Sequence, residues 1–298
     1  MTGSELRQFE RRLKAGLTTS WLGRPFSALA SVDSTNSEVL RYAGQSDQTQ
    51  HPVHGTTIFA DEQTAGRGRR GRSWMAVPGG SLCFSFVLQP GAATLEATET
   101  HASDRSHLAW IPLATALGLA EGIRAATGIA PQVKWPNDLL SNGRKLGGIL
   151  CEAQGHGASQ QIVVGIGINL DSTGADIPPD LQPIMTCLRQ QTRRTIARAE
   201  LLAALLNALE PCLDPFCRTD TADPTTTTSR ADIRRRYRAT CITIGKTVRV
   251  ELSDKSPLTG VAESIADSGA LLIRPTADPG QPSPAPVAVF AGDVVHLR

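Results

Sequence analysis

The nine residues Gln161–Asn169 constrain the fold of this chain more than any other segment. Apolar β-branched side chains occupy alternate positions: Ile162, Val164, Ile166 and Ile168. This period of two is typical of a β-strand with one face in a hydrophobic core. The other face carries Gly165 and Gly167 at successive positions, so it is nearly bare of side chains. Such a face either lets the backbone of a neighbouring helix or strand approach closely, or forms the floor of a ligand site.

The preceding apolar segment, residues 146–153, favours the ligand site. It is predicted to be a strand, and Gly147 and Gly148 extend the bare surface into it. A flat ring fits on a floor of this kind because no side chain stands in its way.

The rest of the first 218 residues mixes helical and strand patterns. We expect helices over residues 5–17, 106–127 and 195–210, and one that follows the capping sequence 33–36 and runs through residue 40. Further strands are expected at residues 57–60, 81–88 and 133–135.

The sequence changes character after residue 218. Residues 219–229 hold no large apolar side chain and are predicted to be a linker. Short strands are then expected at 241–244, 247–252, 260–265, 270–274, 287–290 and 294–297, with a proline-rich hairpin insertion at 277–286. Their even spacing predicts a small β-barrel.

The segment Gly66–Arg72, GRGRRGR, places four arginines in seven residues. These guanidinium groups repel one another unless an anion lies among them, and their planar donors suit phosphate. The spacing also fits a dinucleotide-binding glycine motif, but a strand rather than a helix is expected to follow. A solvated basic loop or an RNA-binding segment is the alternative.

A second charged group lies in the sequence KWPND, residues 134–138, and at Lys145. Pro136 is expected to end a strand and to release Asn137 and Asp138 into a loop, with Lys145 at its other side. A lysine and a carboxylate at a strand end are a common surface pair. Beside the bare strand they also suit charge stabilisation in acyl or phosphoryl transfer. Trp74 is either a core residue or the wall of an apolar pocket.

Composition limits the possible partners. The net charge of +2 does not indicate a long polyanion, and aromatic residues make up only 4%, which argues against a nucleic-acid-binding module. No apolar run is long enough to span a membrane. The six cysteines include no CxxC pair, so we expect a reduced, cytoplasmic protein.

Five motifs together resemble the biotin protein ligase family: DSTN, GRGRRGRSW, KWPND, RKLGGIL and GIGINL, in this order from residue 33 to residue 170. The C-terminal FAGDVVHLR is similar to the end of that family's SH3-like domain. The resemblance implies an α+β fold, with a mixed sheet flanked by helices and then a small SH3-like β-barrel. It divides the chain into an N-terminal extension (1–30), a catalytic domain (31–218), a linker (219–230) and the barrel (231–298).

The resemblance also implies a reaction. Biotin and ATP, with Mg²⁺, give biotinoyl-5′-AMP and pyrophosphate, and the biotinoyl group passes to a lysine of a biotin carboxyl carrier domain. Only 33 residues precede Ser34, too few for a DNA-binding domain of three helices, so we expect the monofunctional class. A lipoate or octanoate protein ligase or transferase of the same fold is the alternative.

Site residues follow from the motif positions. The resemblance makes Lys145, Arg69 and Asp138 catalytic. It assigns biotin to Ser34, Thr35, Asn36, Gln63, Gly66, Arg67, Gly68, Arg69, Trp74, Lys145, Gly165 and Gly167. It assigns the adenylate to Arg67, Arg69, Arg70, Arg72, Asn137, Lys145 and Asn169. No metal-ligating residue is predicted.

Overall fold

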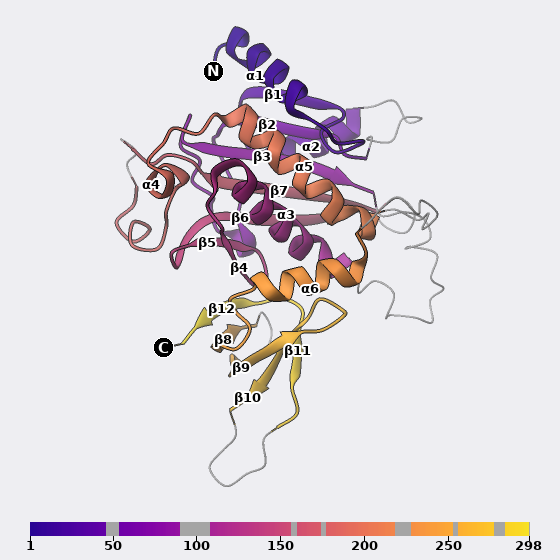
Figure 1. The fold of residues 1–298 in the computed structure, drawn as a ribbon, viewed down its shortest axis with the longest axis vertical. Coiled ribbons are helices and arrows are strands. Elements are labelled where there is room, and N and C mark those ends of the chain that lie inside the picture. The colour runs from indigo at the N-terminus through magenta and orange to yellow at the C-terminus, as the bar shows by residue number, and fades with distance from the viewer. Residues whose placement is uncertain are drawn as a thin grey trace.

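The structure, a computed structural model, describes residues 1–45, 54–89, 108–155, 160–173, 177–217, 228–252, 256–276 and 284–297. Within these ranges the larger sheet has seven strands, in the order β1-β2-β3-β7-β6-β5-β4 (Figure 1). They are β1 (Phe26–Val32), β2 (Thr57–Gln63), β3 (Ser81–Leu88), β4 (Gln132–Lys134), β5 (Asp138–Ser141), β6 (Arg144–Gln154) and β7 (Gln161–Asn169). Strands β1 and β2 are parallel, and the other neighbouring pairs are antiparallel. The predicted mixed sheet is confirmed.

Strand β7 lies at the centre of this sheet, and its boundaries match the sequence pattern. Gly167 pairs with Cys83 of β3 on one side and with Gly148 of β6 on the other. The bare positions of β6 and β7 are therefore neighbours. Gly147 is different, because a Cβ atom there would lie 2.9 Å from Ile168 Cδ1, on the core face. Its expected place in the floor was wrong, since successive strand residues face opposite ways.

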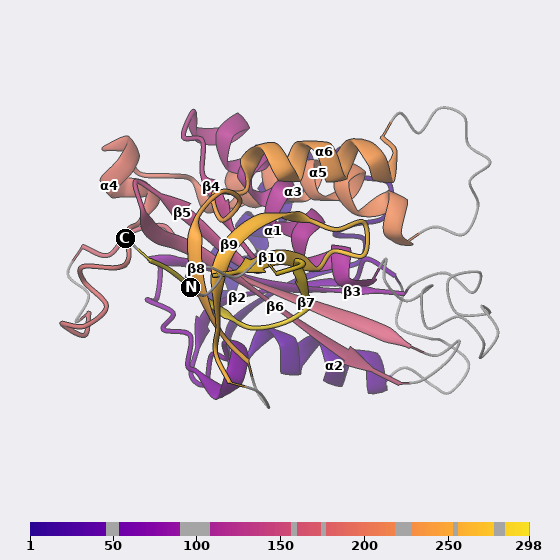
Figure 2. The same cartoon turned by 90° about the horizontal axis from the view of Figure 1, so that it is seen from below.

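Helices cover both faces of the sheet (Figure 2). α3 (Trp110–Thr127) and α5 (Arg198–Cys217) lie over the face that carries Ile166, and α2 (Thr35–Gln45) lies on the opposite face. α1 (Gly3–Gly16) packs against α5 and β1, and a short α4 (Leu188–Thr192) precedes α5. The predicted helices are present. α5 continues past the predicted end at residue 210 and contains Pro211 and Pro215, which are unfavourable inside helices.

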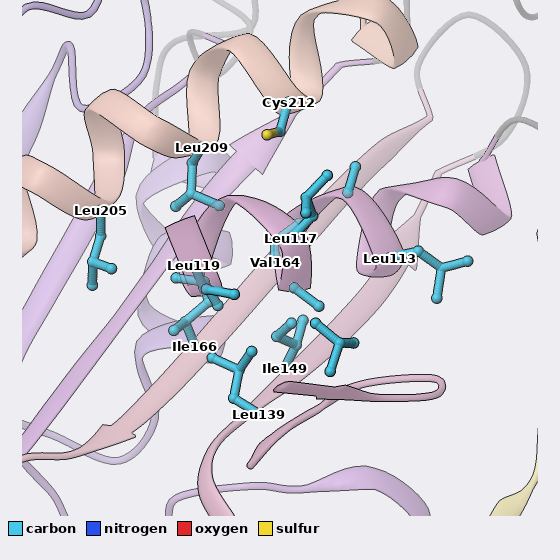
Figure 3. Packing of buried hydrophobic residues seen from close by; sticks show 14 of the residues in the cluster. Leu113, Leu117, Leu119, Leu139, Ile149, Val164, Ile166, Leu205, Leu209 and Cys212 are labelled. Atoms are coloured by element: carbon cyan, nitrogen blue, oxygen red, sulfur yellow. The ribbon is translucent and has the colours of Figure 1, made fainter. Parts of the chain in front are cut away.

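The main core lies between the sheet and the α3–α5 pair (Figure 3). Gly118 and Gly122 of α3 let the two helices approach closely. A Cβ atom at Gly118 would lie 2.9 Å from the Cα atom of Leu209 of α5, and one at Gly122 would lie 2.9 Å from that of Leu205. Leu205 and Leu209 are fully buried, so truncating one to alanine is expected to cost about 2–5 kcal/mol of stability.

The second sheet is antiparallel, with strand order β11-β10-β9-β8-β12. Its strands are β8 (Thr247–Glu251), β9 (Leu258–Ile265), β10 (Leu271–Pro275), β11 (Val287–Val289) and β12 (Asp293–His296). This five-stranded domain agrees with the predicted small barrel. The strand predicted at 241–244 was wrong: this segment is a turn that joins the larger sheet through one bridge from Cys241 to Val133. Most of the predicted linker and of the insertion at 277–286 lies outside the described residues.

A helix that the sequence patterns did not indicate, α6 (Arg230–Thr240), precedes the second sheet. Ser229 caps it, and the Asp232 side chain accepts from the Ser229 backbone in return. Most side chains of α6 are polar, but Ile233 and Tyr237 are fully buried. The Tyr237 ring meets the Trp110 ring of α3 edge-on, with 5.7 Å between centroids. α6 therefore packs on the helices of the larger sheet.

Candidate active site

A cleft opens on the α2 face of the larger sheet, above the glycines of β6 and β7. It is open to solvent on one side and combines a bare floor with polar and cationic side chains. Its lining includes Ser34, Thr35, Asn36, Gln63, Arg67, Gly68, Arg69, Trp74, Asn137, Lys145, Gly148, Gly165 and Gly167. Most of the residues predicted for the site thus come together from segments far apart in the sequence.

The floor of the cleft depends on glycine. A Cβ atom at Gly165 would lie 2.0 Å from Asn36 Oδ1, and one at Gly167 would lie 2.3 Å from Trp74 Cε2. At Gly148 a Cβ atom would lie 3.3 Å from Trp74 Cζ3. The bare face therefore serves two purposes: it lines the cleft, and it leaves room for Asn36 and for the indole of Trp74.

A hydrogen-bonded group of side chains forms the end of the cleft next to α2. The Gln63 Oε1 atom accepts from the backbone nitrogen of Thr35 at 2.8 Å and from its hydroxyl at 3.1 Å. Ser85, which the sequence analysis did not select, lies between Thr35 and Asn36, with its Oγ 2.7 Å from Thr35 Oγ1 and 2.6 Å from Asn36 Oδ1. These groups offer donors and acceptors to a polar ligand ring.

Glu152 is a second residue that the sequence analysis missed. Its Oε2 atom accepts from Asn36 Nδ2 at 2.7 Å and from Arg67 Nη2 at 2.8 Å. A signal was present, because Glu152 is four residues beyond Gly148 in β6 and so lies on the same face of that strand. Glu152 links the α2 end of the cleft to the arginine loop, by which we mean residues 66–72.

Lys145 and Asp138 form an ion pair at the rim, 2.7 Å from Nζ to Oδ1. The Lys145 Nζ atom is also 5.8 Å from the centre of the Trp74 ring. Asp138 is the first residue of β5 and not part of a loop, because the chain turns at residues 135–137 and pairs again immediately. The pair thus rests on two neighbouring strands and faces the cleft.

The backbone of Lys145 is held from behind. Its N–H donates to the carbonyl of Ile184 at 2.7 Å, and its carbonyl accepts from Thr186 at 2.8 Å. Asn169 Nδ2 lies 3.4 Å from the Lys145 carbonyl and 3.1 Å from that of Thr186. Asn169 is absent from the lining of the cleft, so its assignment to the adenylate stays a prediction that this placement does not support.

Arg69 reaches into the cleft from the arginine loop. Its Nη1 atom donates to Asn137 Oδ1 at 2.8 Å, and Asn137 in turn donates to the carbonyl of Ile149 at 3.0 Å. Burial lowers the pKa of Arg69, although the nearby carboxylates of Asp293 and Asp138 oppose this. A guanidinium held in this partly desolvated position is a strong partner for an anionic ligand.

Two arginines of the loop point away from the cleft. Arg72 pairs with Asp293, and the Nη1 atom of Arg70 lies 3.4 Å from the same carboxylate. Gly66 is also outside the lining of the cleft and has a structural role, because a Cβ atom there would lie 2.4 Å from the carbonyl oxygen of Trp74. An outer hollow that includes Gly66, Arg70 and Arg72 adjoins the cleft.

Cys83 and Cys151, two cysteines of the larger sheet, are not activated as nucleophiles. Burial raises the pKa of Cys83 and of Cys151 to about 12, so their thiols stay protonated at neutral pH. In the part of the chain that the structure describes, no group of three or more His, Cys, Asp or Glu side chains is arranged to hold a metal ion. No helix there is long and apolar enough to cross a membrane.

Known proteins resemble this chain over nearly its whole length. Residues 28–169 match the biotin/lipoate A/B protein ligase family, and residues 243–297 match the biotin protein ligase C-terminal domain. A biotin–[acetyl-CoA-carboxylase] ligase from Mycobacterium tuberculosis is 31% identical over 97% of this chain and 96% of its own length. One from Paracoccus denitrificans is 35% identical over 89% of this chain and 100% of its own length.

A solved structure also has the same fold. The biotin protein ligase from Aquifex aeolicus in complex with biotin and ATP superimposes with a TM-score of 0.69 at 25% identity. The match covers 92% of this chain and 98% of that one, and therefore includes both sheets.

Proposed function

This chain belongs to the biotin protein ligases of the biotin/lipoate A/B protein ligase family, and we propose that its cleft makes biotinoyl-5′-AMP and then passes the biotinoyl group to a lysine side chain. The observation that carries the proposal is the convergence of Arg69 and Lys145 on one cleft above a glycine floor. Two cations beside an uncharged surface suit a ligand with a flat ring at one end and a phosphate at the other.

In the first step a carboxylate oxygen of biotin bonds to the α-phosphorus of ATP, and the bond from that phosphorus to the bridging oxygen breaks to release pyrophosphate. A carboxylate is already ionised at pH 7, so this step needs no general base. The demand is for stabilisation of the negative charge that collects on the phosphate oxygens. Arg69 and Lys145, which both line the cleft beside residues 137 and 138, supply it, and Arg67 in the same lining adds to it.

In the second step the amine of the acceptor lysine attacks the carbonyl carbon of the mixed anhydride, and AMP leaves with the anhydride oxygen. Lys145 is again suitably placed, because negative charge moves to the carbonyl oxygen and then to the phosphate of AMP. Asp138 is a hydrogen-bond acceptor at the open rim, where it orients the incoming amine. Its ion pair with Lys145 keeps both groups at the same point before the acceptor arrives.

Biotin itself is proposed to lie with its ureido ring at the α2 end of the cleft. Ser34, Thr35, Asn36 and Gln63 line this end and carry both donors and acceptors. Burial of such groups makes the site selective, because a ligand that cannot pair with them leaves them unsatisfied. The Trp74 indole then walls the valeryl chain. A lipoyl or octanoyl chain has no ureido group and would leave these residues unpaired.

Magnesium is proposed to enter with the nucleotide. The described residues lack a cluster of three possible ligands, and Mg²⁺ commonly binds to substrate phosphates and water with one or two carboxylates. Its role when bound is to neutralise phosphate charge. Asp138 is a carboxylate at the rim of the cleft, and its place in the ion pair with Lys145 makes it an orienting group first.

The acceptor is proposed to be a biotin carboxyl carrier domain, because the relatives from M. tuberculosis and P. denitrificans are named for acetyl-CoA carboxylase. We place the reaction in the cytoplasm, where ATP is abundant. The six cysteines, all free and mostly buried, fit the reducing conditions there.

The test is pyrophosphate release from purified protein mixed with ATP-Mg and biotin. Release that depends on biotin, and that lipoate and octanoate do not support, is the expected result. Release with lipoate or octanoate in place of biotin would favour the alternative of a lipoate or octanoate protein ligase. Absence of release with all three acids would overturn the proposal. Thermal stabilisation by each acid gives a second measurement that does not depend on catalysis.

A further inference from the structure

The arginine loop contacts the second sheet at the place where β8 ends and β12 begins. Arg72 pairs with the Asp293 carboxylate, and the Nη1 atom of Arg70 lies 3.4 Å from it. The Nη2 atom of Arg70 also donates to the carbonyl oxygen of Glu251 at 2.8 Å. Glu251 and Asp293 are opposite each other in the β8–β12 pair, so these acceptors form one compact patch.

The backbone of the loop separates its arginines into two groups. Arg70 has φ 55° and ψ 41°, a left-handed conformation that is unusual for a residue with a side chain, and Gly71 follows with φ 71°. This reversal lets Arg69 line the cleft, with its Nη1 atom also 3.4 Å from the Gly292 carbonyl oxygen, while Arg70 extends to the carbonyl of Glu251. A left-handed arginine is retained where surrounding contacts hold it. Asp293 and the Glu251 carbonyl are among the contacts that hold Arg70.

Charge explains why a carboxylate is needed at this patch. Four guanidinium groups in seven residues repel one another, and the cleft holds only two of them at its lining, Arg67 and Arg69. Asp293 compensates Arg70 and Arg72, as Glu152 compensates Arg67. Asp293 is fixed in position, because β12 is paired along its length with β8 and Val294 is buried.

We propose that Asp293 is a positioning residue for the arginine loop: it draws Arg70 and Arg72 onto the C-terminal domain and thereby keeps Arg69 over the cleft. Asp293 is not one of the residues that line the cleft. The C-terminal domain then contributes to catalysis through the loop. This inference rests on the proposed function, since the loop matters for covering the adenylate, and it reassigns Arg70 and Arg72 from the adenylate to Asp293.

The principal variant is Asp293→Asn, which removes the charge and keeps the shape. Glu251→Gln is the matched control. Glu251 is the residue opposite Asp293, its carboxylate pairs with Arg249 at 2.9 Å, and its backbone carbonyl, which the substitution keeps, accepts from Arg70. Asp293→Asn should raise the KM for ATP and the labelling of a bystander protein by escaped intermediate about five- to tenfold. Glu251→Gln should stay within about twofold of the parent.

Hydrogen exchange of amides 66–73, measured without substrates, reports on the loop independently of catalysis. Faster exchange in this segment in Asp293→Asn, with unchanged exchange in β7, is expected. The double variant Arg72→Gln with Asp293→Asn should release no more intermediate than the more affected single variant, because the two residues act as a pair. If Arg72→Gln releases intermediate while Asp293→Asn behaves as the parent in exchange and in KM, Arg72 binds the nucleotide directly and the inference is wrong.

The two proposals fail in different ways. A parent protein without biotin-dependent pyrophosphate release overturns the proposed function. A parent with normal release, together with an Asp293→Asn variant that equals Glu251→Gln in every measurement, overturns only the role of Asp293.

Discussion

The ammonium group of Lys145 lies 2.7 Å from the carboxylate of Asp138, and the two residues come from adjacent strands of the same sheet. A register shift between Leu139 and Leu140 brings about this placement, because it sets Lys145 opposite Leu140 while Asp138 stays opposite Gly148. Both side chains are only partly exposed, at 36% and 24%. The lysine is thus held in place before any substrate enters.

Lys145→Ala is expected to slow both half-reactions. Removal of one preorganised donor typically raises a barrier by about 3 kcal/mol, or roughly a hundredfold in rate. Stability should change little, because the side chain is at the rim. Single-turnover rates of adenylate formation and of transfer from preformed adenylate are the measurements. Lys246→Ala, in an exposed turn, is the control. If Lys145→Ala had the same rates as the parent protein, Lys145 would have no part in the mechanism.

Asp138→Asn should affect the two steps unequally. Adenylate formation needs no base and should slow by less than about tenfold, whereas transfer to the acceptor lysine should slow by more than that, since an orienting acceptor is lost. The ratio of the two single-turnover rates is the quantity to follow. Equal slowing of both steps would mean that Asp138 acts only by holding Lys145.

Arg69→Gly is expected to loosen the cover over the intermediate. It removes a charge-assisted contact worth about 1.5–3 kcal/mol, so dissociation of biotinoyl-5′-AMP should rise roughly ten- to a hundredfold. Escaped anhydride then labels lysines of an unrelated protein. Bystander biotinylation by the variant and not by the parent is the readout. Arg69→Lys keeps the charge without the planar donor pair and should fall between the two.

Gly167→Ala should weaken biotin binding because its Cβ atom would displace Trp74, whose Cε2 would be 2.3 Å away. Gly122→Ala is the control for a purely structural effect, since its Cβ atom would instead press on Leu205 in the α3–α5 interface. Each change should cost about 1–3 kcal/mol of stability. Calorimetric titration with biotin should show lower affinity in Gly167→Ala alone. If Gly167→Ala bound biotin as tightly as the parent protein, the indole of Trp74 would not be part of the biotin site.

The contact between the domains should respond to pH through His296. Burial lowers the pKa of this histidine, and the charges of Lys134 and Lys246 lower it further. Protonation is therefore less favourable in the folded protein than in the unfolded chain, whose pKa is about 6.5. The free energy of unfolding therefore keeps the full contribution of neutral His296 above pH 6.5. It loses this contribution as the pH falls below 6.5. Melting curves between pH 5 and 8 should show a steeper acid loss for the parent than for His296→Gln.

Local patterns predicted the centre of the fold well. The alternation in Gln161–Asn169 fixed both ends of β7, and the same was true of the apolar run that forms β3. Gly165 and Gly167 were assigned to a ligand floor because the missing side chains have a direct steric meaning. Lys145 was assigned from its motif, and the structure places it at the cleft.

What escaped prediction depends on contacts between distant segments. Glu152 and Ser85 contact Asn36 of the cleft because of the register of β6 and β3 with their neighbours, which no single segment specifies. The direction of Arg70 is set by its left-handed backbone and by Asp293, more than 200 positions later. Helix α6 was missed because its polar composition hides a stripe of only two buried residues.

The place of α6 bears on how this protein can be divided. Its buried Tyr237 and Ile233 join the helices of the larger sheet, so the segment between Cys217 and Thr228 connects two elements of one packed layer. A polypeptide ending at residue 217 would lack a helix that covers Trp110. Two fragments, 1–217 and 228–298, would each carry half of a complementary apolar surface and should reassemble when they are produced together.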